Sequence, residues 1–521
     1  MKLRGLSLVL VLLLLSAVLG AILVTPAAAK KKPPPPPPTP PPPPPSTSTL
    51  YVKDYADVLN GAKCDLTPEA VEATADGGSI LLALASCRSV TWVVKLDAFG
   101  NPQWQKEIGC LGPTPGGYHY GLSLQQTADG GYVFAGGTSY CDANPVCPYD
   151  QCGLIVRLDA SGNLVWTRVY LAAGRSAGFE DVRQTSDGGF VAAGHYIDFD
   201  SNIGAAILKV DSLGHVQWQR TVGPGGPSGP GHMHTFFNAV QQTADGGYVA
   251  AGQFYNYLRR PEGDAGVLVV RLGATGTISW QRGFQSFDSS GVPTANEFVS
   301  SITQTSEGGY LVAGSWNNTT GPGTCCQGPM LLKLDAAGQS QWQNAYHAGV
   351  QCHGGHPNSC SAQGGLVYSV HQTSDGGYAF AGTGDRLSDG TMVPALAKTD
   401  SSGNLLWQYF YWQSYTAGGG PLSQYFASSS LTRDGGHLAL GFTGNPFNPY
   451  DLKGELFLVR TDSAGLVGAC GQIHPATPLT VVDPGLAGFD TSFPVRTTIA
   501  AQADLPGTTQ PTSVRTSGGG C

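Results

Sequence analysis

The hydrophobic positions of this chain fall into short runs that are separated by turn residues. Each run holds 5 to 8 residues, is rich in β-branched and aromatic side chains, and ends near an Asp-Gly or Asp-x-x-Gly sequence. Such runs are typical of β-strands, and Asp-Gly sequences supply the positive φ that tight hairpins need. Outside residues 1–29 no window shows a sustained 3.6-residue period, so the pattern predicts an all-β protein with almost no helix.

One short motif, Thr-x-Asp-Gly-Gly or a close copy of it, occurs seven times. An apolar run, a variable segment and two further runs joined by a Gly turn follow each copy, which predicts four antiparallel strands per unit. The spacings between successive copies are 53, 58, 58, 62, 68 and 59 residues. The acidic positions are Asp76, Asp129, Asp187, Asp245, Glu307, Asp375 and Asp434.

A second motif, Leu-Asp-x-x-Gly-x-x-x-Trp, covers the last two strands of each unit. The Asp position, occupied by Gly273 in one copy, precedes Trp by seven residues in all six complete copies. We expect these indoles to pack on the neighbouring unit, where a buried Trp contributes about 3 to 5 kcal/mol. They are Trp104, Trp166, Trp218, Trp280, Trp342 and Trp407.

Seven four-stranded units in series fit a closed ring, because radial repetition leaves only short protected sheet edges. The seventh unit breaks off after residues 459–462 without a fourth strand, whereas residues 50–55 resemble that strand, with Tyr51 in the aromatic place. We therefore predict a seven-bladed β-propeller over residues 50–470, with the N-terminal strand as the outer strand of the last blade.

The two motifs together resemble the β-propeller repeats of secreted bacterial and archaeal surface proteins, over about residues 50–470. That resemblance implies the propeller fold and no particular reaction. The Asp-to-Trp half is also similar to the tryptophan-docking motif of quinoprotein dehydrogenases. Its turn is one residue shorter, and there are seven repeats instead of eight, which argues against quinone binding.

The amino-terminal segment predicts export. Lys2 and Arg4 precede the apolar residues 6–24 and an Ala-Ala-Ala site at residues 27–29, the layout of a signal peptide over residues 1–29. Residues 30–49 form a Lys/Pro-rich stalk or linker, in which twelve prolines favour polyproline II. The apolar run is also long enough to remain as an uncleaved anchor. With cleavage, no membrane span is expected, and the protein is secreted, extracellular or in the cell envelope.

The net charge narrows the class of partner, and the cysteine content indicates disulfide bonds. The 521 residues include 28 Lys+Arg and 36 Asp+Glu, a net charge of -8, and no basic run beyond residues 30–32, which argues against nucleic acid. All 12 cysteines lie in the exported part, where disulfides are favoured over reactive thiols. One hypothesis pairs Cys470 with Cys521, which would fasten the Pro/Thr/Gly-rich tail of residues 471–521 to the ring.

All the length variation lies in connections that a four-stranded blade places at one end. These include residues 139–152, 221–235, 253–265, 315–328 and 346–365, and variable loops on a rigid scaffold are where recognition usually occurs. Aromatic side chains in and beside them suit sugar stacking or protein contacts. The candidate ligand-binding residues are Tyr118, Tyr120, Tyr140, Tyr149, Phe254, Tyr255, Tyr257 and Trp316.

Histidines on the same face raise a speculative metal site. His232 and His234 on one loop, and His353 and His356 on another, could bind a metal ion through imidazole nitrogens. The alternative is solvated loop histidines beside structural disulfides, and no cofactor is predicted otherwise. We expect the acids of the Thr-x-Asp-Gly-Gly turns to cap their own turns, because the turns lack the oxygen ligands of a calcium loop.

No catalytic motif is present: there is no nucleophile elbow, phosphate loop, His-Glu-x-x-His or telling carboxylate pair. The preferred hypothesis is therefore a secreted or cell-surface binding and scaffold protein that engages an extracellular protein or glycan through the long-loop face. The alternative is an exported propeller enzyme, either a quinoprotein-like oxidoreductase or a polysaccharide-acting enzyme, with its site at the mouth of the central channel.

Overall fold

The computed structural model describes strands and tight turns throughout. Residues 44–521 form one compact unit, and all described residues belong to it. No helix long and apolar enough to cross a membrane occurs among them. The described residues are 50–59, 62–86, 89–109, 118–139, 151–171, 176–198, 202–223, 233–256, 264–287, 290, 292–318, 327–348, 366–385, 392–411, 416–417, 420–421, 423–444, 455–467, 473–475, 479–482, 486–490, 495–497, 501–504, 508–510 and 514–517.

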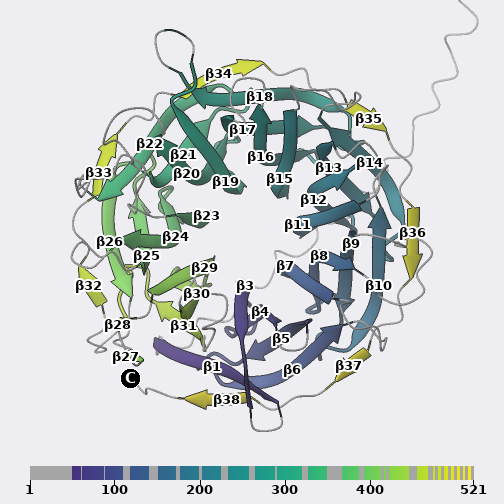
Figure 1. Cartoon of the computed structure of the whole chain (residues 1–521), viewed down its shortest axis with the longest axis vertical. Helices are drawn as coiled ribbons and strands as arrows, with labels where there is room; N and C mark the ends of the chain where they lie inside the picture. The colour runs from purple at the N-terminus through teal and green to yellow at the C-terminus, as the bar shows by residue number, and fades with distance from the viewer. Residues whose placement is uncertain are drawn as a thin grey trace, which may run out of the picture. The chain divides into compact units, whose positions relative to one another are not determined.

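The predicted fold is confirmed: the unit is an all-β propeller of seven blades, each with four antiparallel strands (Figure 1). We number the blades 1 to 7 in chain order. The innermost strands are β3 (Leu66–Ala73), β7 (Tyr118–Gln126), β11 (Ser176–Gln184), β15 (Met233–Gln242), β19 (Ala295–Gln304), β23 (Val367–Gln372) and β29 (Ser423–Leu431). The second strands are β4 (Ser79–Ala85), β8 (Tyr132–Ser139), β12 (Phe190–Ile197), β16 (Tyr248–Asn256), β20 (Tyr310–Asn318), β24 (Tyr378–Asp385) and β30 (His437–Gly444).

The outer half of each blade contains the third and fourth strands. The third strands are β5 (Val90–Leu96), β9 (Gln151–Leu158), β13 (Ile203–Val210), β17 (Asp264–Leu272), β21 (Gln327–Leu334), β25 (Met392–Thr399) and β31 (Glu455–Thr461). The fourth strands of blades 1 to 6 are β6 (Pro102–Gly109), β10 (Leu164–Leu171), β14 (Val216–Val222), β18 (Ile278–Ser286), β22 (Ser340–Ala348) and β26 (Leu405–Tyr411). A small hairpin of β27 (Thr416–Ala417) and β28 (Gly420–Pro421) lies between blades 6 and 7 in the chain.

In blade 7 the place of the fourth strand is taken by β1 (Tyr51–Leu59), which pairs antiparallel with β31. Its Tyr55 is fully buried, and the hydroxyl donates a 2.7 Å hydrogen bond to the carbonyl oxygen of Gly100 in blade 1. Tyr170 and Tyr346 make the equivalent bond to the next blade. The side chain of Tyr51 lies outside the described residues. That β1 holds the ring together remains a prediction about stability.

The hydrophobic core is divided among the blade interfaces. Seven large clusters of buried side chains occur among the described residues, and each joins two adjacent blades. The cluster between blades 7 and 1 contains Tyr55 of β1 beside Trp92 and Leu458. Because each blade buries both of its faces, the strands are almost continuously apolar, and the loss of one blade would expose two interfaces.

The six tryptophans lie on the fourth strands and contact the next blade, as predicted. The Trp104 ring meets Tyr132 edge-on at 5.7 Å between centroids, and a Cβ at Gly162 would collide with its indole. Trp218 and Trp280 repeat both contacts two and three interfaces further on. The turn glycine of the second motif therefore supplies both a positive φ and the space that the indole fills.

The C-terminal segment adds a fifth strand to the outer edge of every blade, in reverse order around the ring (Figure 1). These seven strands, coloured yellow, start on blade 6 and end on blade 7, where the last one pairs with β1. On the same edge, β2 (Ala62–Cys64) pairs with the end of β1. The seven are β32 (Ile473–Pro475), β33 (Leu479–Val482), β34 (Leu486–Asp490), β35 (Val495–Thr497), β36 (Ala501–Asp504), β37 (Thr508–Gln510) and β38 (Val514–Ser517).

Candidate active site

Every innermost strand contains a β-bulge at the same position of its blade. In blade 1, Pro68 pairs with Ala83 and Ala70 with Leu82, which leaves Glu69 unpaired. A bulge twists its strand and re-aims a side chain, and all seven bulged residues line the central cavity. They are Glu69, Leu122, Glu180, Asn238, Ser300, Tyr368 and Ala427.

A glycine of the second strand makes room for the bulge in blades 2 to 7. In blade 3, Gly194 lies opposite the bulge, and a Cβ there would overlap the carbonyl oxygen of Gly178. Blade 1 has Ala83 at this position. The apolar run that follows the Thr-x-Asp-Gly-Gly motif ends in Ala-Gly in five repeats. This glycine recurs because it makes room for the bulge in the channel wall.

The seven innermost strands enclose a cavity of about 1070 Å³. That volume is at the upper end of the range for small-molecule pockets, ~300–1,000 Å³. Serine hydroxyls form much of the wall, and carboxylates project into it from blades 1 and 3. The cavity is therefore large, polar and hydroxyl-lined, which suits a sugar chain better than an apolar ligand.

Two of the bulged residues, Glu69 and Glu180, are carboxylates. Burial and the nearby charge of Glu180 raise the pKa of Glu69 to about 8. Glu69 is therefore mostly protonated at neutral pH and can donate a proton. The two acids come from β3 and β11, with the bulged Leu122 of blade 2 between them in ring order.

Glu180 has a polar neighbour on the second strand of its own blade. Its Oε1 lies 3.4 Å from Nδ1 of His195 on β12, and its side chain is 29% exposed. The His195 ring packs 5.9 Å from the Phe236 ring of blade 4. Gly178 leaves the space for this imidazole, because a Cβ there would lie 2.8 Å from the His195 Cε1.

A second polar layer lies three residues further along the innermost strands, toward the Thr-x-Asp-Gly-Gly turns. Arg183 is paired with Asp181, at 3.2 Å between Nη2 and Oδ1. Burial raises the pKa of Glu72 to about 7, although the Arg183 charge and a hydrogen bond from the Gln126 backbone N–H act against it. His371 places Nε2 2.8 Å from the Ser429 carbonyl oxygen, and burial lowers its pKa.

Aromatic side chains line the channel next to the carboxylates. Tyr368 and Tyr425 lie 6.4 Å apart between ring centroids, and burial raises the pKa of both hydroxyls. On the far side, Tyr255 contacts Phe236 and Phe298 at 5.7 and 6.5 Å. Rings of this kind offer stacking surfaces for sugar faces.

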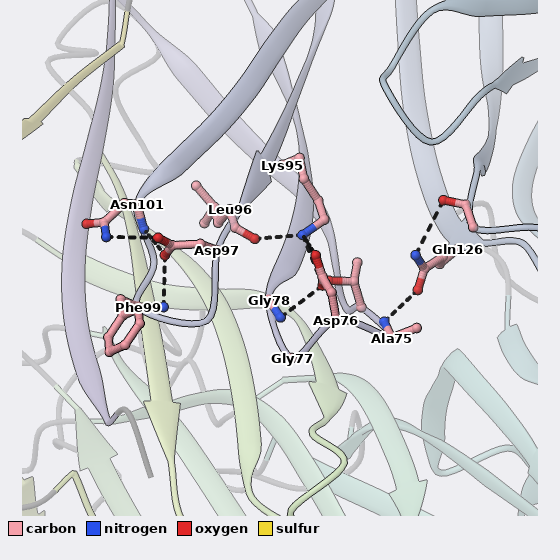
Figure 2. A network of polar contacts seen from close by, with 12 residues as sticks. Ala75, Asp76, Gly77, Gly78, Lys95, Leu96, Asp97, Phe99, Asn101 and Gln126 are labelled. Atoms are coloured by element: carbon pink, nitrogen blue, oxygen red, sulfur yellow. Dashed lines mark hydrogen bonds and ion pairs between the residues drawn. The ribbon is translucent and has the colours of Figure 1, made fainter. Parts of the chain in front are cut away.

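The acids of the Thr-x-Asp-Gly-Gly turns have a structural role, as predicted (Figure 2). Asp76 accepts hydrogen bonds from the Thr74 hydroxyl at 2.5 Å and the Gly78 backbone N–H at 3.1 Å. It also pairs at 2.8 Å with Lys95, whose side chain is only 4% exposed. The same acid-to-cation pair recurs in all seven blades.

The glutamines three residues before these acids connect the blades. Gln126 of blade 2 accepts a 2.7 Å hydrogen bond from the Ala75 backbone N–H of blade 1, which Figure 2 shows beside the Asp76 turn. Equivalent bonds, 2.7 to 2.8 Å long, are accepted by the side-chain oxygens of Gln184, Gln242, Gln304 and Gln372. These glutamines therefore connect neighbouring blades.

Most of the predicted loop residues lie outside the described residues. Of the four histidines predicted as metal ligands, only His234 is described, half-buried on β15. No group of three or more metal-binding side chains occurs within the described part of the chain. Cys152 on β9 is disulfide-bonded. Outside the description lie His232, His353, His356, Tyr140, Tyr149, Tyr257 and the side chain of Tyr118.

The other predicted aromatic residues lie on strands instead of loops. Phe254 is 3% exposed and belongs to the core between blades 3 and 4, whereas Tyr255 beside it is half-buried near the channel. Tyr120 is half-buried and contacts the Gln151 side chain. Trp316 packs on the core between blades 4 and 5. Neither Tyr120 nor Tyr255 lines the cavity, although Tyr255 contacts the lining residue Phe298.

Sequence analysis missed the channel residues, although the repeats contain a signal for them. The bulged position lies seven residues before the acid of the Thr-x-Asp-Gly-Gly motif in every blade, and Glu72, Arg183 and His371 lie four before it. These positions differ from repeat to repeat, so a search for what recurs passes over them. Alignment of the repeats on the acid would have placed Glu69 and Glu180 at equivalent sites.

Comparison with known proteins gives the fold and no family. No family model matches the chain, and no curated protein matches it. Solved structures that resemble it include an ulvan lyase bound to a GlcA–Rha3S ligand, with 9% identity, 79% of this chain and 97% of that chain covered, and a TM-score of 0.48. An α-L-arabinanase from Penicillium chrysogenum has 11% identity, coverage of 66% and 92%, and a TM-score of 0.38.

A glucose dehydrogenase is also similar, with 13% identity, coverage of 65% of this chain and 96% of that chain, and a TM-score of 0.33. At such values no residue role passes from these proteins to this chain. The resemblance of the repeats to those of secreted bacterial and archaeal proteins therefore stays a prediction.

Proposed function

We propose that this chain is an exported propeller enzyme that cleaves glycosidic bonds of a polysaccharide in its central channel. The observation that carries the proposal is the carboxylate pair of Glu69 and Glu180, on bulges of blades 1 and 3. Enzymes that hydrolyse glycosides commonly use two carboxyl groups, of which one is kept protonated by its surroundings.

Glu69 has the properties of the general acid. Its pKa of about 8 keeps a proton on the carboxyl group at neutral pH. In the proposed reaction that proton passes to the glycosidic oxygen as the bond from this oxygen to the anomeric carbon breaks. The leaving sugar then departs as a neutral alcohol, which removes the main barrier to cleavage.

Glu180 supplies the second carboxyl group. As a base, it takes a proton from water while the water oxygen bonds to the anomeric carbon; as a nucleophile, it bonds to that carbon first and water replaces it. His195, 3.4 Å away, orients the Glu180 carboxylate from outside the channel. The water and the two carboxyl groups account for every proton in the net hydrolysis.

The channel wall supports binding of a sugar chain. The rings of Tyr368 and Tyr425 provide stacking surfaces, and Ser300 and Ser369 present hydroxyl groups. The long connections, which the sequence predicts at one end of the blades, would surround the entrance of the channel. Tyr140, Tyr149 and the other aromatic residues of these loops therefore remain proposed contacts. Export by the signal segment and a stalk at residues 30–49 would place the enzyme where it meets extracellular polysaccharide.

We prefer the enzyme alternative to the binding and scaffold hypothesis because the Glu69 carboxyl group is protonated at neutral pH. The protonated carboxyl group of Glu69 lines the channel together with Glu180, an arrangement that suits proton transfer to a bound sugar chain better than binding alone. A quinoprotein-like oxidoreductase is the less favoured enzyme, because the described channel residues offer no feature specific to a quinone.

The experiment is a screen of the full-length protein against neutral, acidic and amino-sugar polysaccharides, with new reducing ends as the readout. Wild-type protein is expected to cleave at least one polymer. Glu69→Gln and Glu180→Gln are each expected to lower kcat by about 10²- to 10⁴-fold. The wild-type rate is expected to fall above about pH 8, as Glu69 loses its proton.

The matched control is Asp159→Asn, which changes a carboxylate on a surface turn of blade 2, where it caps Ser161 and Asn163. This variant is expected to keep wild-type kcat. Unchanged kcat in Glu180→Gln would contradict the proposal. A polymer or protein that binds without being cleaved would support the binding and scaffold hypothesis instead, and unsaturated sugar ends would indicate elimination.

A further inference from the structure

The fourth strand of each blade has an outer edge that no strand of its own blade covers. An uncovered strand edge is a template for other strands, and natural sheets protect it with bulges or with a covering segment. In blade 2, Leu164 pairs with Leu158 and Trp166 with Arg157, which leaves Val165 unpaired and 56% exposed. The same bulge occurs near the start of the fourth strand in blades 1 to 6, so this part of each edge is a poor template.

The C-terminal strands cover the other part of each edge, and we call residues 473–517 the strap. In blades 1 to 6 the strap pairs with the last three to five residues of the fourth strand, for example residues 168–171 of β10. These stretches lie beside the interblade cores, where Tyr170, Phe284 and Tyr346 are at most 1% exposed. The strap therefore covers the regular part of these edges, where another strand would pair most easily.

The strap encircles the ring and crosses every interface between blades (Figure 1). Val467, which precedes the strap, packs in the core between blades 6 and 7. β32 then pairs with blade 6, and the following strands pair with blades 5, 4, 3, 2 and 1 in turn. β38 returns to blade 7, where it pairs with β1. Two blades therefore cannot move apart unless the strap lets go of one of them.

The strap is built so that it can leave the edges while the blades stay folded. Each of its seven strands has only 3 to 5 residues and pairs with one blade, and among the described strands none pairs with another part of the strap. A strand of this length is marginal by itself. The blades have hydrophobic cores of their own, whereas the strap binds through the sum of seven short pairings along one chain.

Prolines keep the strap strands separate from one another. A proline cannot donate a hydrogen bond to a strand ladder, so it limits the length of the strand beside it. Five of the six segments that connect the strap strands contain one, namely Pro478, Pro484, Pro494, Pro506 and Pro511. Each strand can therefore leave its blade without pulling on a longer continuous ladder.

We propose that the strap is a removable cover that keeps the blade edges of two copies of this chain from pairing. When the strap leaves, the regular part of an edge can pair antiparallel with the same part on a second copy, because a two-fold axis relates identical antiparallel strands. Several such edges on one ring would strengthen the association. This role does not depend on the chemistry of the channel, so each proposal can fail without the other.

The experiment releases the strap from the folded full-length protein. Residues 468–472, which precede the strap, are replaced by the recognition sequence of a site-specific protease, and Cys521→Ser removes the only cysteine that follows them. No disulfide can then tether the cut strap or link two copies through it. After cleavage the strap is washed off in urea below the unfolding transition, and the urea is removed. Light scattering measures the molecular mass, and near-ultraviolet circular dichroism reports on the packing of the tryptophans.

Two matched controls are the cut protein with its strap still bound and the uncut protein after the same urea step, and both are expected to keep the mass of the untreated protein. Strap-free protein is expected to keep its circular dichroism spectrum and to rise at least about twofold in mass. Addition of a peptide of residues 473–517 is expected to restore the original mass. A strap-free protein whose mass does not rise would overturn the inference.

Two further outcomes would also overturn it. If the strap leaves only when the tryptophan signal is lost, it is part of the blades instead of a cover. If the mass rises and the peptide does not reverse the rise, damaged chains have associated and the edges have not paired.

Discussion

Each third strand contains one buried cation whose counter-charge lies in the turn of its own blade. Lys209 is 2% exposed and donates to Asp187 at 2.9 Å, to the Val210 carbonyl oxygen and to Gln217. Because the Asp187 carboxylate is half-exposed, the free-energy cost of burying a charge falls mainly on Lys209. The attraction of the Asp187 carboxylate offsets this cost. Sequence analysis explained Asp187 as a turn cap and overlooked Lys209, because a single Lys or Arg inside an apolar strand looks like an ordinary exception.

Asp187→Ala is expected to lower the free energy of unfolding by about 2 to 3 kcal/mol, because it leaves the Lys209 ammonium buried beside neutral groups only. Asp211→Ala is the matched control: Asp211 caps the other turn of the same blade, at 2.9 and 2.8 Å from the Leu213 and His215 N–H groups. The control should cost about 1 kcal/mol. Chemical denaturation at neutral pH measures both, and equal losses would contradict a special role for the ion pair.

The same pair predicts how stability depends on acid. Burial acts to raise the pKa of Asp187, but hydrogen bonds from Thr185 and Lys209 outweigh it and lower the pKa to about 2. Because the pKa of Asp187 is lowered in the folded state, its ionised carboxylate stabilises that state at pH values above the ordinary Asp pKa. This stabilisation is lost as the pH falls toward 2. Wild-type protein should therefore lose stability between about pH 4 and pH 2, and Asp187→Ala should lose less over that range; an equal loss would contradict this cause.

At the scale of strands and turns, the two recurring motifs were enough to predict the blades. The β-bulge of each innermost strand, which the motifs do not reveal, positions the residues of the site. The bulge changes pairing by a single residue, which hydrophobic periodicity does not reveal. The missing side chain of Gly194 is what allows the carbonyl oxygen of Gly178 to approach. The carboxylates of the channel are therefore placed by small residues on the neighbouring strand.

Gly194→Ala is expected to push β11 away from β12 and to move Glu180. Overpacking of this kind costs about 1 to 3 kcal/mol. Gly136→Ala in blade 2 is the matched control, because it creates the same collision with a backbone carbonyl oxygen, that of Tyr120, beside the bulged Leu122, which is no carboxylate. Both variants should lose similar stability, but only Gly194→Ala should lower kcat. Equal kcat in the two variants would contradict the positioning of Glu180 by its bulge.

For the whole molecule, the number of blades, the strand count and the interblade tryptophans followed from the sequence, because each depends on a pattern that is repeated. The strands of residues 473–517 did not. Each has 3 to 5 residues, too few for a periodic signal, and pairs only because a blade edge is already present. Because each tail strand pairs with the edge of a different blade, the tail sequence contains no local signal of its structure.

Deletion of residues 46–58 is expected to lower the melting temperature by roughly 5 °C or more, because it removes Tyr55 from the core between blades 7 and 1. Deletion of residues 514–517 is the control, since it removes β38 from the outer edge of β1 and keeps Cys521. Its effect should be smaller. An unchanged melting temperature after the first deletion would show that β1 does not hold the ring together.

The most direct test of the account is a crystal structure of the Glu69→Gln protein with an oligosaccharide of the polymer that the wild-type protein cleaves. We expect the sugar chain inside the channel, with one glycosidic oxygen beside residue 69 and the adjoining anomeric carbon facing Glu180. A sugar chain bound only outside the channel, with the space between these two residues free of it, would contradict the assignment of the site.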